Sequence, residues 1–87
     1  MHAVVITGTF VDRAAAEAEL PELIEGVSGM PGFVAGYWVA LSGDQAHAMI
    51  VFDSEDGAQM LADQARGGPS DAVAASAIQV GEVLRSA

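Results

Sequence analysis

The sequence predicts a single α+β domain over residues 1–87 with the element order β-α-β-β-α-β. Three observations favour it. Four segments are rich in apolar and β-branched residues, as strands are, and two segments between them carry apolar residues at helical spacing. Glycine, proline and acidic residues cluster at the junctions between these segments. The chain has the length of one domain, and 52% of its residues are hydrophobic.

The first strand is expected over residues 3–11, where both alternate faces are apolar. Asp12 has a side chain suited to the N-cap of a helix. The expected helix has glutamates on one side and an apolar stripe on the other, made of Ala16, Leu20, Leu23, Ile24 and Val27. Pro21 leaves two alternatives: the helix kinks there, or a short first turn ends and Pro21 begins a second segment.

Two further strands, again apolar on both faces, are expected over residues 33–41 and 46–52. The connection between them contains Gly43 and Asp44, two residues that adopt positive φ easily, and this predicts a hairpin turn.

Residues 53–56 are expected to cap a second helix, and their acidic groups complement the positive end of its dipole. Its stripe is Ala58, Leu61, Ala62 and Ala65. A last strand is expected over residues 77–84. The order defines the ferredoxin-like pattern, a four-stranded antiparallel sheet with both helices on one face. Because the strands are apolar on both faces, we expect a homodimer whose sheets cover each other's second face.

The charge balance excludes several partners. The net charge is −9 and the chain has no lysine, so no basic patch for nucleic acid or for an anionic membrane can form. There is no cysteine, and no segment approaches the roughly 20 apolar residues that span a bilayer. We expect a cytoplasmic protein without a signal peptide.

Three short motifs occur in a familiar order: Pro-Gly-Phe at 31–33, Gly-Tyr-Trp at 36–38, and Val-Phe-Asp-Ser-Glu at 51–55 before an alanine-rich helix. Over nearly the whole chain this resembles the antibiotic-biosynthesis-monooxygenase-like branch of the dimeric α+β barrels. The resemblance implies a homodimeric barrel with a pocket between sheet and helices in each subunit. Some members of that family oxidise polycyclic phenols with oxygen and no cofactor, and others cleave haem.

The haem-degrading members use an asparagine on the first strand, a tryptophan on the second helix and a histidine beyond it. The resemblance places Thr7 at the asparagine position and Met60 and Leu61 near the tryptophan position, and no histidine follows. An axial imidazole is the ordinary haem anchor. The sequence therefore argues against haem degradation.

Trp38 and His47 are the candidate catalytic residues. If Gly43 and Asp44 are the two turn residues, His47 shares a face with Met49 and Trp38, where it could act as a general base. The competing interpretations are core or interface packing for Trp38 and an exposed strand position for His47.

Further ligand-binding candidates could line a pocket or contact an anionic group: Thr7, Tyr37, Met49, Met60, Gln64 and Arg66. Each has a structural alternative, such as packing for the apolar residues and helix-dipole complementation for Arg66. No spacing of His, Asp or Glu supports a metal site.

The resemblance, taken with these candidate residues, implies a cofactor-independent monooxygenase that binds a small planar aromatic substrate. The alternative is a non-catalytic dimer of the same fold that binds a small apolar ligand or is associated with stress. A third interpretation is a purely structural dimer.

Overall fold

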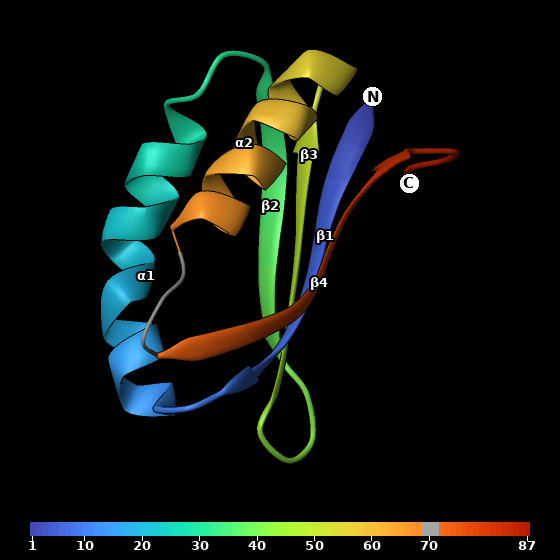
Figure 1. The fold of residues 1–87 in the computed structure, drawn as a ribbon. Coiled ribbons are helices and arrows are strands. Elements are labelled where there is room, and N and C mark those ends of the chain that lie inside the picture. Colours follow the sequence, from blue (N-terminus) through green and yellow to red (C-terminus); the bar gives the residue numbers. More distant parts are fainter. Residues whose placement is uncertain (69–71) are drawn as a thin grey trace.

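The computed structural model describes residues 1–68 and 72–87. Its elements are β1 (His2–Phe10), α1 (Arg13–Ser28), β2 (Phe33–Ala40), β3 (Gln45–Phe52), α2 (Glu55–Gly67) and β4 (Val73–Glu82). The strands form one antiparallel sheet in the order β2-β3-β1-β4 (Figure 1). Both helices lie on the same side of this sheet, which confirms the predicted ferredoxin-like fold.

The helix starts follow the predicted capping. The Asp12 carboxylate accepts a hydrogen bond from the backbone N–H of Ala15 at 3.1 Å, and the Ser54 hydroxyl accepts one from Gly57 at 3.2 Å. Each bond satisfies a donor that has no partner inside the helix. Pro21 lies within one continuous helix, so the alternative of two segments is wrong. The carbonyl that Pro21 leaves unbonded belongs to Glu17, which is exposed to water.

The core lies between α2 and the sheet. Val4, Ile50 and Phe52 are the largest fully buried side chains, and they meet Ala58 and Ala62 of α2. Short alanine side chains let the helix backbone approach the strands closely. The predicted stripe of α2 is therefore buried as expected, with Ala65 half-buried at its end.

Helix α1 departs from its predicted packing. Only Ala16 and Val27 of its stripe are buried, while Leu23 is 47% exposed and Ile24 38% exposed. Several of the strand residues that face this part of α1 are small, and they include Gly8, Ala40, Ala46 and Ala48. They are too short to reach across to α1, so a gap remains between the helix and the sheet.

The hairpin between β2 and β3 has a different register from the predicted one. Gly43 has φ +70°, but Asp44 does not have a positive φ, and the N–H of Leu41 donates to the carbonyl of Gln45 at 2.9 Å. Three residues therefore form the loop, and Trp38 pairs with Ala48. The prediction that His47 and Met49 share a face with Trp38 is wrong, because one added loop residue moves them to the opposite face.

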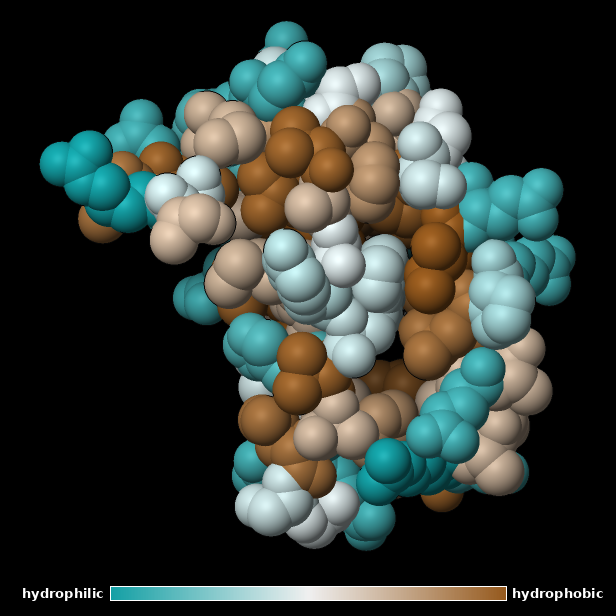
Figure 2. Space-filling view, turned by 180° about the vertical axis from the view of Figure 1, so that it is seen from behind, coloured by the Kyte–Doolittle hydropathy of each residue, from teal (hydrophilic) through white to brown (hydrophobic). Residues whose placement is uncertain are grey.

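The second sheet face has no covering element within the described residues. Pairing places Val5, Tyr37, Val39, Met49 and Val51 on it, and we call these five side chains the open face. Tyr37 is 61% exposed, Val39 44% and Met49 40%. The view from behind shows hydrophobic patches around a centre of intermediate hydropathy, with the most hydrophilic residues nearer the edge (Figure 2).

None of the described helices is long and apolar enough to cross a membrane. The cytoplasmic location stays a prediction.

Candidate functional site

A large apolar cavity lies between α1, the C-terminal half of α2 and the helix side of the sheet. Its volume is about 1110 Å³, and it is visible as a hollow in the surface (Figure 2). It occupies the gap beneath α1. The larger apolar side chains around it are Ile6, Phe10, Leu20, Leu23, Trp38 and Ile78. Ligand pockets in proteins typically measure about 300–1,000 Å³ and are lined in this apolar way.

Trp38 forms one wall of this cavity, and a glycine fixes how its ring lies. A Cβ atom at Gly36 would come within 2.7 Å of Cη2 and 2.8 Å of Cζ3 of the indole. The ring therefore occupies the place that a side chain at position 36 would take, on the helix side of the sheet. Because the chain has one tryptophan, this indole is also a unique fluorescent reporter of the cavity.

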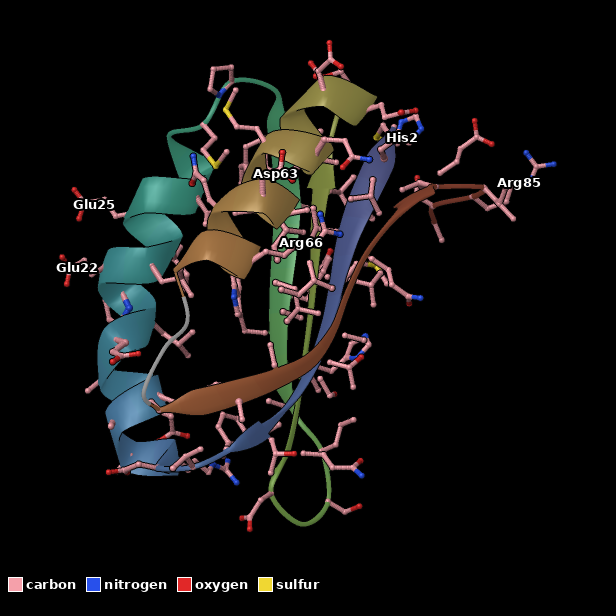
Figure 3. The ribbon with its side chains drawn as sticks, in the orientation of Figure 1. His2, Glu22, Glu25, Asp63, Arg66 and Arg85 are labelled. Atoms are coloured by element: carbon pink, nitrogen blue, oxygen red, sulfur yellow. The ribbon has the colours of Figure 1, made fainter. Side chains whose placement is uncertain are left out.

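Gln64 and Arg66 border the cavity from the end of α2. Arg66 donates from Nη1 to Oδ1 of Asp63 at 3.3 Å and from Nη2 to the carbonyl of Ile78 at 3.0 Å. Its guanidinium is directed from α2 toward the strands (Figure 3). Arg66 thus joins the end of α2 to β4 and places a cation at the cavity.

The other predicted site residues lie elsewhere. Thr7, Tyr37 and Met49 have their side chains on the open-face side of the sheet, and Met60 is 52% exposed and does not border the cavity. His47 borders the cavity, but it pairs with Thr7 and Val39, which puts its imidazole on the side away from Trp38. The predicted catalytic pair is therefore not assembled around one space.

Sequence reasoning missed the even-numbered positions of β1 and the α1 residues at the cavity, Ile6, Gly8, Leu20 and Leu23. Gly36 carried a usable signal, since a glycine two residues before Trp38 leaves room for its ring on the same face. Among residues 1–68 and 72–87, no three His, Asp or Glu side chains gather as a metal site would require.

No family model matches the chain, and no curated protein matches it. Its fold is similar to that of solved structures, among them two structures of one protein. One is the haem-degrading protein Rv3592 of Mycobacterium tuberculosis in a haem-free, cleaved form, with a TM-score of 0.67 and 20% identity over 100% of this chain and 99% of that chain. The other is the same haem degrader, MhuD, with two haems bound in its active site, with a TM-score of 0.55 and 21% identity over 97% of this chain and 98% of that one.

These structures correct the predicted function. Their shared fold belongs to a protein that binds and degrades haem, which contradicts a cofactor-free monooxygenase acting on a small planar aromatic and gives no support to the non-catalytic alternative. The cavity agrees with the correction, because its volume of about 1110 Å³ lies at the upper end of ligand pockets and leaves room for a large ligand. The argument from Thr7 against haem also loses its basis, because this side chain lies on the other side of the sheet from the cavity.

Proposed function

We propose that this chain is a single-domain haem-binding protein of the dimeric α+β-barrel type, and that haem enters the cavity beneath α1. The observation that carries the proposal is the cavity itself, about 1110 Å³ in volume and walled by Ile6, Leu20, Leu23, Trp38 and Ile78. The solved structures with this fold, which are those of a haem degrader, support haem over other ligands.

The residues present fit the ring of haem. Apolar side chains from α1, β1, β2 and β4 surround the space, so a large flat macrocycle would be removed from water on both faces. Trp38 would lie against the ring, and Leu20 and Leu23 would cover it from α1. Bound haem would supply an iron centre able to bind oxygen, while the chain's own side chains hold the ring and exclude water.

Titration of the purified protein with haemin tests this directly. We expect saturable quenching of Trp38 fluorescence at one haemin per chain, together with a shifted Soret band, because the only indole borders the cavity. Quenching that rises without saturation would contradict a defined site. The same sample, given ascorbate and oxygen, separates a haem degrader, whose Soret band decays, from a haem carrier, whose band persists.

A matched pair on α1 tests the place of binding. Leu23 borders the cavity and Ile24 does not, although both are partly exposed. We expect Leu23→Gln to weaken haemin binding about fivefold, since roughly half of a leucine's transfer free energy of 1.5–3 kcal/mol is lost.

The control, Ile24→Gln, should bind haemin as the unmodified protein does. Both variants alter exposed positions, so circular dichroism should show that both fold. Equal weakening in the two variants would place the ligand elsewhere.

The homodimer is part of the proposal. The open face presents Tyr37, Val39 and Met49 to solvent, in a domain so small that it buries only about 60% of the surface its unfolded chain exposes. Packing two such faces together would cover these side chains. Most of the cavity lining lies on the opposite side of the sheet, and Val39 and His47 border the cavity from the open-face side.

A further inference from the structure

We infer that the cavity recognises its tetrapyrrole by the carboxylates on the ring edge, through Arg66, and not by the iron at the ring centre. The inference rests on the proposed function and narrows it. The ligand class becomes porphyrins that carry free carboxylates, whether or not a metal is bound at the ring centre.

The chain offers the iron no imidazole. It has two histidines. Nε2 of His2 lies 3.3 Å from a carboxylate oxygen of Glu55, away from the cavity, and His47 lies with the open face. Met30 borders the cavity, but its side chain packs against the buried core. Because an axial side chain is what normally fixes haem iron, the metal should add little to binding here.

The ring-edge carboxylates meet a single cation. Arginines 13, 66 and 85 are the only basic residues of the chain apart from its histidines, and of these three only Arg66 borders the cavity. Arg13 pairs with Glu17 at 3.4 Å, and Arg85 lies on the segment beyond β4 (Figure 3). Any charge recognition of an anionic ligand in this cavity must therefore involve Arg66.

Arg66 is held in position and still has capacity to bind. Its bonds to Asp63 and to the Ile78 carbonyl fix the guanidinium plane between α2 and β4. A guanidinium has five N–H donors, and these bonds use two of them. Its side chain is 49% exposed, so a carboxylate can reach it from solvent.

The acidic character of α1 disfavours placing the carboxylate edge of the ring on that side of the cavity. Glu17, Glu19 and Glu22 border the cavity on that side, although Glu17 is paired with Arg13 and Glu22 is directed away from the sheet (Figure 3). Propionates directed toward α1 would be repelled by this charge. The carboxylate edge is therefore directed to the α2 end, where Arg66 lies.

The test compares three ligands on the full chain: haemin, iron-free protoporphyrin IX and its neutral dimethyl ester. Dissociation constants come from Trp38 quenching in one buffer with one low detergent concentration. We expect haemin and protoporphyrin IX to bind within about threefold of each other, and the ester about tenfold more weakly, as for the loss of a charge-assisted hydrogen bond.

Arg66→Leu should weaken both carboxylate ligands about tenfold and leave the ester unchanged, and Arg66→Lys should restore part of the loss. Arg85→Leu is the matched control and should change nothing. Arg66 also joins α2 to β4, so its loss could weaken binding simply by disturbing the structure. The neutral ester separates this structural role from recognition of the carboxylates. If Arg66→Leu weakened the binding of all three ligands equally, its role would be structural and the inference would be overturned. Haemin binding more than about tenfold tighter than protoporphyrin IX would also overturn it, by showing an iron ligand. If no tetrapyrrole binds, the proposed function itself fails.

Discussion

Phe52→Ala is expected to lower the free energy of unfolding by about 3–5 kcal/mol, the cost of removing a large aromatic side chain from a packed core. Phe52 is fully buried at the end of β3. Its ring meets that of Phe33 edge-on, with centroids 6.2 Å apart and planes at 83°. A Cβ atom at Gly57 would come within 3.0 Å of its Cδ1, so the ring also packs tightly against the first turn of α2.

A domain of 87 residues has a total stability of roughly 4–13 kcal/mol, so the substitution should remove a large part of it and would unfold a domain at the lower end of that range. Urea denaturation followed by circular dichroism measures the change. Phe10→Ala is the control, because Phe10 is only partly buried at the far end of β1, and we expect it to cost about 1 kcal/mol. If the free energy of unfolding of the Phe52 variant lay within about 1 kcal/mol of that of the unmodified protein, the core would not be centred on Phe52.

Met49→Lys is expected to convert the proposed dimer into monomers, raising the dimer dissociation constant at least about a hundredfold. Met49 lies within the open face, paired with Val5 on one side and Tyr37 on the other. In a dimer packed through these faces an added ammonium would be buried without a partner, which costs about 3–5 kcal/mol. The monomer tolerates the change, because Met49 is 40% exposed in the single chain.

Sedimentation velocity over a range of concentrations measures the assembly. Met60→Lys introduces the same charge at a methionine that is 52% exposed on α2, and this control should remain dimeric. A Met49 variant that sediments as a dimer would place the interface on another surface.

The element order could be predicted because its signals are local. Asp12 and Ser54 cap helices through bonds to residues three positions away, and apolar strand segments are separated by glycine, proline and acidic clusters. The two bulky candidates on β2 were expected to point to opposite sides of the sheet, and Trp38 and Tyr37 do so.

The candidate site could be predicted only in part, because its composition depends on register and packing. Trp38, Gln64 and Arg66 border the cavity as pocket candidates should, whereas Thr7, Tyr37 and Met49 lie with the open face. One residue more in the hairpin loop than expected separates His47 from Trp38. The apolar stripe of α1 gave no sign of the cavity on which the proposed function depends, although the family resemblance implied a pocket between sheet and helices.

The sequence by itself therefore determined the ferredoxin-like order, the helix caps and the shortage of cations, since each depends on composition or on neighbours a few residues apart. Only the tertiary structure decided which strand residues face the helices and how far α1 lies from the sheet. The physical reason is that side chains alternate along a strand, so a shift of one residue reverses every face. The distance of α1 from the sheet depends on how small the facing strand residues are. Gly8 and Ala48, for example, border the gap but lie outside α1 in the sequence, and Ala48 lies far from it.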